Sequence, residues 1–206
     1  LRLVEDNEMK AQRLRTEKFM GERQGRTDRE YATAILQRFL SKAFRRPATS
    51  EQVAKYVAIV IEHTADGRRF KDGVHLAIRA ALCSPQFLYR GSEEGVLDDY
   101  DLASRLSYFL SGSPPDEKLL ALAAKGELSE PHRLAAETRR LISSNRVNRF
   151  LDSFTGQWLD LRLLPEIMPD SRLINWNDNY LKAITAETQL FIAEILRENH
   201  PLKTFI

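Results

Sequence analysis

Apolar residues recur at intervals of three and four along almost the whole sequence, and this spacing constrains the fold more than any other feature. It places apolar side chains on one face of an α-helix, whereas a half-buried strand needs strict alternation of apolar and polar residues. Alternation of that kind never persists long enough for a strand. We therefore predict an all-α fold of about nine helices with no sheet.

Capping residues and helix breakers predict where the helices begin and end. Thr27 and Glu30 form a capping box, in which both side chains accept hydrogen bonds from backbone amides at a helix start. Pro47 prevents the same helix from continuing. Ser84 and Asn145 are expected to be N-caps of later helices. The helices are expected over about 7–22, 27–44, 50–67, 70–82, 98–111, 116–125, 130–142, 145–158 and 178–199.

Several apolar segments are expected to be buried. Cys83 follows small residues at a helix end and is interpreted as a small core residue. Trp158 continues a stripe that contains Phe150 and Phe154, so we expect it in the core. Residues 162–177 form an ordered loop whose many apolar side chains are expected to pack down. The last helix is expected to turn inward Tyr180, Leu181, Ile184, Thr188, Phe191, Ile192, Ile195 and Leu196.

A change of composition at residues 91–95 marks the expected domain boundary. Two glycines, a serine and two glutamates separate two segments with strong helical patterns there, and such clusters are typical of loops. We therefore predict two consecutive helical-bundle modules, 27–92 and 96–206, preceded by a charged helical arm at 1–26.

Length and charge exclude several classes of protein. A chain of 206 residues can bury a helical core without a disulfide or a metal. Its formal charge of +2 argues against a nucleic-acid partner. No apolar run is long enough to cross a membrane. The sequence begins at Leu1 with neither Met nor a signal peptide, so we interpret it as a processed protein or an excised fragment.

Signatures of metal, haem and nucleotide chemistry are missing from the sequence. Cys83 is the only cysteine, which excludes an internal disulfide, a CxxC site and a CxxCH haem attachment. The acidic residues near His63 and near His75 are interpreted as solvated helix ends, so we predict no metal site and no cofactor in this chain. The acidic group at 98–101 suits a helix start better than acid–base catalysis. Nucleophile-elbow and phosphate-loop motifs do not occur, and no catalytic residue is assigned.

Four side chains stand out as candidate contacts to a ligand or a partner. Arg105 lies one helical turn from Asp101 near an apolar face, where it would pair with Asp101 or Asp116 or bind a ligand. Tyrosine and tryptophan rings can stack on sugars or pack against partners. The candidates are Arg105, Tyr108, Trp158 and Trp176.

An ordered set of short motifs resembles one protein family. The motifs are Ala43–Pro47, Ser84–Arg90, Leu102–Leu110, Pro115–Glu117, Phe154 and Gln157–Arg162. As a set they resemble the planctomycete-type multidomain cytochrome-c-associated proteins of unknown function, from about Tyr31 to the end of the chain. The motifs are signatures of helix packing rather than of a reaction.

The resemblance implies a large exported parent, in the periplasm, in the cell envelope or outside the cell, that carries a c-type cytochrome module. Any haem c would belong to another part of that parent, because this chain lacks CxxCH. Residues 111–114 stand where the family pattern has a tryptophan and a methionine. The second module is expected to be truncated at its C-terminus, since the family pattern continues beyond Ile206.

Three functions are compatible with the sequence. The leading hypothesis is a non-catalytic helical structural or interaction module that packs against a cytochrome c domain and other modules of its parent. The alternative is that Arg105, Tyr108, Trp158 and Trp176 help to form the substrate site of a redox or polysaccharide-processing enzyme. A hydrolase would need a nucleophile and a base, for which Cys83 and His75 are the available pair.

Overall fold

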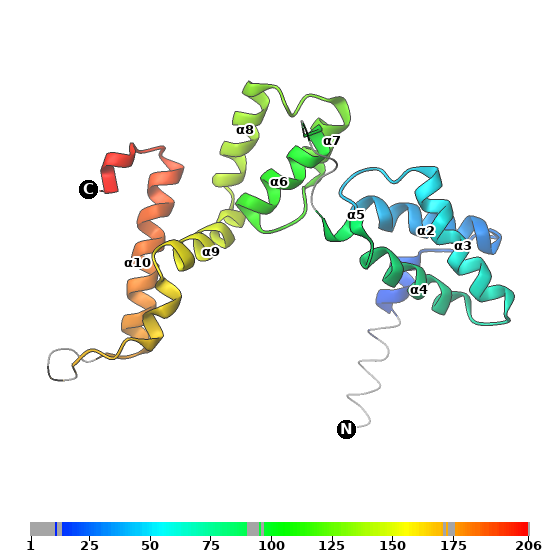
Figure 1. The fold of residues 1–206 in the computed structure, drawn as a ribbon, viewed down its shortest axis with the longest axis horizontal. Coiled ribbons are helices and arrows are strands. Elements are labelled where there is room, and N and C mark those ends of the chain that lie inside the picture. Colours follow the sequence, from blue (N-terminus) through cyan, green and yellow to red (C-terminus); the bar gives the residue numbers. More distant parts are fainter. Residues whose placement is uncertain are drawn as a thin grey trace. The chain divides into compact units, whose positions relative to one another are not determined.

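The computed structural model describes residues 11, 14–89, 95, 97–170, 172 and 176–205, which form helices and no strand (Figure 1). The predicted all-α fold is confirmed. The chain divides into two compact units, Leu1–Gly91 and Ser92–Ile206. Of the helix predicted over 7–22, residues 14–20 are helical, while 1–10, 12 and 13 lie outside the described residues. The separate arm at 1–26 stays a prediction.

Three helices of unit 1 each pack against the other two: α2 (Asp28–Ala43), α3 (Ser50–Ala65) and α4 (Phe70–Leu82). A single turn, α5 (Pro85–Leu88), follows α4. The helices bury one apolar stripe each, as their spacing predicts. The largest fully buried side chains of this core are Ile35, Leu36, Leu40, Val57, Val60 and Val74.

The predicted start of α2 is confirmed, because Thr27 and Glu30 form the capping box. Ser84 stands at the N-cap position of α5 but does not cap it: its hydroxyl donates back to the carbonyl of Ala81 at 2.6 Å. The burial predicted for Cys83 is wrong, and its side chain is exposed. The buried face of α4 passes through Ala77 and Ala81, so position 83 falls beyond the helix end and off that face.

A buried arginine joins the end of α2 to α5. The backbone of Arg45 is left-handed, with φ of 60°, and 6% of the residue is exposed. Its guanidinium donates to the carbonyl oxygens of Gln86, Phe87 and Tyr89 at 3.0 to 3.3 Å. Carbonyls at the end of a helix lack partners within the helix, so Arg45 supplies donors to residues that α5 leaves unsatisfied.

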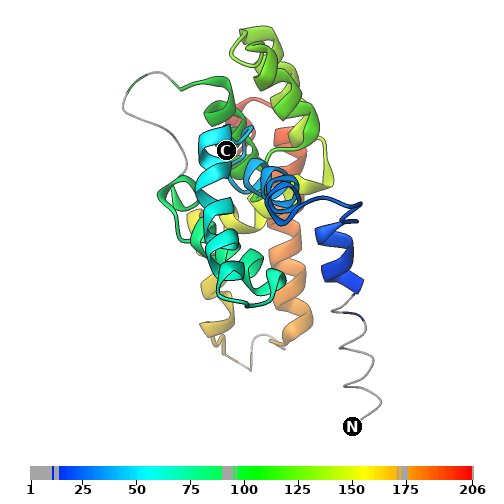
Figure 2. The same cartoon turned by 90° about the vertical axis from the view of Figure 1, so that its right-hand side faces the viewer.

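Unit 2 is built around two clusters of buried residues. The first lies among α6 (Asp99–Ser111), α7 (Glu117–Lys125) and α8 (Pro131–Ile142). The second lies between α9 (Asn148–Trp158) and α10 (Asp178–Arg197), and α10 runs as one continuous helix in both views (Figures 1 and 2). Short 3-10 helices complete the unit: η1 (Asn145–Val147), η2 (Leu161–Glu166) and η3 (Leu202–Phe205).

Helices α6 and α7 begin and end close to their predicted bounds. Asp98 and Asp116 cap α6 and α7, and the left-handed Gly112 and Gly126 end them. The N-cap role predicted for Asn145 is wrong. Ser144 accepts from the Arg146 amide instead, and Asn145 begins a 3-10 turn that leads into α9.

The predicted burial of several large apolar side chains in unit 2 is wrong. Trp158 is 54% exposed and Phe154 is also exposed. The buried stripe of α9 passes through Val147, Leu151 and Thr155, and a step of one residue rotates a side chain by about 100° around a helix. The loop prediction fails in the same way, because the described side chains Leu163, Ile167 and Met168 are exposed.

On α10, the exposed rings of Tyr180 and Phe191 contradict their predicted inward positions. Ile192 and Ile195, also predicted inward, are buried. The buried residues of α10 lie in its C-terminal half. The apolar pattern continues along the whole helix, so it predicts more burial against neighbouring helices than the structure shows. Leu173 and Ile174 of the preceding loop lie outside the described residues.

Two helical glycines should respond oppositely to alanine. A Cβ at Gly73 would lie 3.2 Å from the Val60 carbonyl oxygen and 3.3 Å from the His63 Cβ, whereas a Cβ at Gly156 meets nothing within 4 Å. Gly73→Ala should lower the free energy of unfolding by about 1 kcal/mol because backbone must shift. Gly156→Ala should raise it by about 0.5–1 kcal/mol through helix propensity. Urea unfolding followed by circular dichroism measures both. A stabilised Gly73→Ala variant would contradict the tight α3–α4 contact.

Candidate functional site

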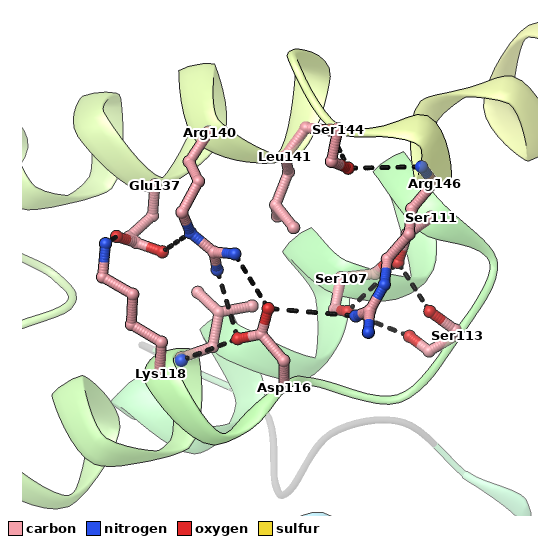
Figure 3. Close-up of polar contacts among 11 residues, drawn as sticks. Ser107, Ser111, Ser113, Asp116, Lys118, Glu137, Arg140, Leu141, Ser144 and Arg146 are labelled. Carbon is pink, nitrogen blue, oxygen red and sulfur yellow. Dashed lines mark hydrogen bonds and ion pairs between the residues drawn. The ribbon is translucent and has the colours of Figure 1, made fainter.

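One carboxylate, Asp116 at the start of α7, contacts two other elements of unit 2 (Figure 3). Asp116 caps α7 by accepting from the Leu119 amide at 3.0 Å. It also accepts two hydrogen bonds from Arg140 of α8, at 2.9 and 3.1 Å. Arg146 of η1 approaches the same carboxylate at 3.8 Å. Bidentate arginine–carboxylate pairs fix geometry as well as charge, so Asp116 sets how α7, α8 and the start of α9 meet.

A second carboxylate, Glu137, continues this network into the interior. It is 3% exposed, yet it accepts from Arg140 Nε and from Lys118 Nζ, each at 2.6 Å. A buried charge is tolerated only when it is paired and hydrogen-bonded. The two cations balance the two carboxylates, so the network is close to neutral and holds α7 against α8.

Three serine hydroxyls fix the turn that delivers Asp116. Ser107 and Ser111 are fully buried in α6. Ser107 Oγ donates to the Ser113 carbonyl at 3.0 Å, and the Ser111 and Ser113 hydroxyls lie 2.8 Å apart (Figure 3). The turn between them needs a left-handed residue, which Gly112 provides at φ of 56°.

Competing effects act on the pKa of Asp116. Burial tends to raise the pKa of this carboxyl, and the hydrogen bonds from Arg140 and from the Leu119 amide outweigh burial, so its pKa lies below the ordinary value. Asp116 is therefore a stable anion and a poor proton donor at neutral pH, which suits a structural role better than acid–base catalysis.

A hollow of about 470 Å³ opens beside this network. Its walls come from the turn after α6 and from the first residues of η1 and α9, so the Asp116 network holds them together. We call it the basic hollow, and it is lined by Ser113, Pro114, Pro115, Asp116, Asn145, Arg146 and Arg149.

An aromatic row crosses from α6 to α9 in the same unit. It consists of Phe109, Phe150, Phe154 and Trp158, whose successive ring centroids lie 5.2, 5.1 and 5.1 Å apart. Phe109 is 67% exposed, and Phe154 and Trp158 are also exposed. Residues four apart share a helix face, so the three rings of α9 form one continuous apolar strip.

The sequence candidates are distributed over different parts of unit 2. Arg105 is exposed on α6 and has no ion pair with another described residue, and Asp116 pairs with Arg140 instead. Tyr108 and Trp176 are half-buried, and Trp176 stacks on Tyr180 with centroids 6.5 Å apart. Trp158 alone of the four belongs to the aromatic row. The described pockets of unit 2 are lined by other residues, and a ligand role for the four stays a prediction.

In the described part of the chain, the candidate nucleophile and base are not in contact, and no cluster of metal-ligating side chains is found. Cys83 and His75 are exposed and lie eight residues apart, about 12 Å along α4. Among the described residues, no group of three or more His, Cys, Asp or Glu side chains could hold a metal ion. None of the described helices is long and apolar enough to cross a membrane.

Sequence reasoning missed Glu137, Arg140, Arg146 and Arg149. One signal was present, because Glu137 and Arg140 stand three residues apart on a predicted helix, a spacing that favours ion pairs. That spacing gives no hint of Asp116, which is 24 residues from Arg140 in sequence. Only the packing of α7 on α8 reveals the network.

Removal of Arg140 should destabilise unit 2. Arg140→Met leaves Asp116 without its bidentate partner and Glu137 with Lys118 alone, so we expect a loss of about 2 kcal/mol in the free energy of unfolding. Arg133→Met is the matched control on the same helix, because Arg133 makes only a 3.8 Å exposed pair with Glu127. It should change stability by less than about 1 kcal/mol. Equal effects in chemical unfolding would contradict the network's role.

The low pKa of Asp116 predicts a dependence on pH. Folding favours the charged form, so its contribution is present above the ordinary pKa of 3.8 and is lost as the pH falls through the lower folded pKa. The stability difference between the wild type and Asp116→Asn should be constant above about pH 5 and shrink below pH 3.8. Urea unfolding at a series of pH values measures it. A difference that grows in acid would contradict this assignment.

Comparison with known protein families identifies both parts of the chain. Residues 31–91 match the family described as PSD5, protein of unknown function (DUF1595), and residues 97–206 match the family described as PSD4, protein of unknown function (DUF1592). Neither the curated proteins nor the solved structures give a match. The second match covers more than half of the chain, which therefore belongs to the PSD4 family of proteins of unknown function, here preceded by a PSD5 domain.

Proposed function

We propose that this chain is a non-catalytic interaction module that packs against other modules of a larger, exported, cytochrome-c-associated protein. The observation that carries this proposal is the aromatic row, an apolar strip that unit 2 leaves exposed. Contiguous exposed apolar patches on folded domains mark interaction sites. Any haem c would lie in another module of the parent.

The composition of the aromatic row supports docking. Phenylalanine and tryptophan are enriched in the centres of protein interfaces, where a few large rings carry most of the binding energy. Neighbouring rings already hold one another in place at about 5 Å, so a partner would order few additional side chains. Low ordering cost strengthens binding by a preformed surface.

The arrangement of families supports another module of the parent as the occupant of this surface. Two domains of unknown function follow one another in this chain, and both families are planctomycete-type cytochrome-c-associated. A protein built from consecutive modules supplies its domains with neighbours at high effective concentration, so that even a modest surface is occupied. We propose that the parent is exported, as the resemblance of the sequence motifs implies.

The substrate-site alternative has less support. It needs Arg105, Tyr108, Trp158 and Trp176 to face one concave site, and the described pockets of unit 2 are lined by other residues. Trp158 belongs to a row of rings in mutual contact, which is an arrangement suited to an apolar partner surface.

Tryptophan fluorescence can test docking directly. The chain has two tryptophans, so Trp176→Phe leaves Trp158 as the reporter. Titration with the modules encoded next to this chain in its parent should shift the Trp158 emission to shorter wavelength as the ring leaves water. In calorimetry, Phe154→Ser should weaken binding at least about tenfold, since truncation of an interface ring costs more than about 1.4 kcal/mol.

Leu190→Ser is the matched control, because Leu190 is exposed in the same unit but lies outside the aromatic row. It should leave the affinity unchanged. Absence of binding to every neighbouring module, or equal losses in both variants, would refute the proposed docking surface.

A further inference from the structure

The basic hollow carries more positive charge than its own carboxylate can neutralise. Asp116 accepts hydrogen bonds from the two terminal guanidinium nitrogens of Arg140 and from the Leu119 amide. Arg146 reaches it only at 3.8 Å and keeps half of its side chain exposed. Arg149 has no ion pair with any residue in the described part of the chain. Two arginines with weak charge compensation or none therefore line the hollow.

Arg146 and Arg149 lie close together in the sequence, in two consecutive helical segments. Arg146 in η1 and Arg149 in the first turn of α9 stand three residues apart, a spacing that brings side chains together on one helix surface. Like charges at that spacing repel each other, and an anion between them removes the repulsion. The positive end of the α9 dipole lies at the same place and adds to the attraction for an anion.

Gly112 lies beside the aliphatic stem of Arg149. A Cβ added to the glycine would make ordinary van der Waals contact with that stem, 3.5 Å from the arginine Cδ and 3.7 Å from its Cβ. The same turn is tied to α6 by the Ser107 and Ser113 hydrogen bond. The backbone of this wall is thus fixed by the folded core of unit 2.

We propose that the basic hollow binds a small organic oxyanion, with Arg146 and Arg149 as its charged ligands. A planar guanidinium matches the paired oxygens of a carboxylate, sulfate or phosphate group. The side-chain amide of Asn145 lines the same space and can donate a further hydrogen bond. A volume of about 470 Å³ exceeds the needs of an inorganic ion and lies in the range of small-molecule sites.

One side of the basic hollow is apolar and can contact the carbon part of a ligand. The exposed Pro114 presents carbon surface beside the two arginines, which suits a ring or a short carbon chain that carries the anionic group. A negatively charged monosaccharide or a small organic acid has this combination of charge and carbon surface. The site shares no residue with the aromatic row, so it is independent of the proposed docking function.

The test is titration of the chain at constant ionic strength, because screening by salt weakens exposed charge interactions. The probes are glucuronate, glucose 6-phosphate and inorganic sulfate, with neutral glucose and chloride as controls. The side-chain Nε–H signals of Arg146 and Arg149 in NMR spectra report where the probe binds. We expect saturable shifts at both arginines with the organic anions, weaker ones with sulfate and none with glucose.

Two variants make the proposal falsifiable. Arg146→Gln and Arg149→Gln should each weaken binding of the organic anions by roughly tenfold, the loss of one charge-assisted contact. Arg139→Gln, an exposed arginine of α8 away from the hollow, should leave binding unchanged. Thermal unfolding checks that all three variants fold. Shifts that never saturate, shifts that chloride reproduces, or equal losses in all three variants would overturn the proposal.

Discussion

Unit 2 depends on one carboxylate, Asp116, because four structural requirements meet at it. It caps α7, orients Arg140 of α8, approaches Arg146 of η1 just before α9 and lies in a turn fixed by the buried hydroxyls of α6. Burial alone would make such a charge costly. The bidentate pair with Arg140 offsets that cost and couples the helices, so the basic hollow is a direct product of the same geometry.

In unit 1 a buried cation, Arg45, joins two helices as the anion Asp116 does in unit 2. Arg45 is buried at the end of α2 and satisfies carbonyl groups at Gln86, Phe87 and Tyr89. The two segments that it joins, residues 43–47 and 84–90, are those that carry the family resemblance in this unit. Their residue pattern is thus explained by a contact that joins two helices.

Local signals predicted helix ends well and side-chain environments less well. Thr27, Asp98 and Gly126 act through neighbours within a few residues, so the sequence contains all the information that their roles require. The environment of Trp158 depends on which of two adjacent apolar stripes of α9 meets α10, and periodicity cannot choose between stripes about 100° apart. Arg140 and Asp116 are likewise joined only by tertiary packing.

The basic hollow and the aromatic row both include residues of α9, at different positions along the helix. The first turn of α9 carries Arg149, next to Arg146 of η1, where the dipole favours an anion. Its remaining turns carry Phe150, Phe154 and Trp158, which water solvates poorly. A charged ligand at one end would leave the apolar strip free for a partner. Salt should weaken the first interaction and leave the second largely intact, because screening acts on charge and not on apolar burial.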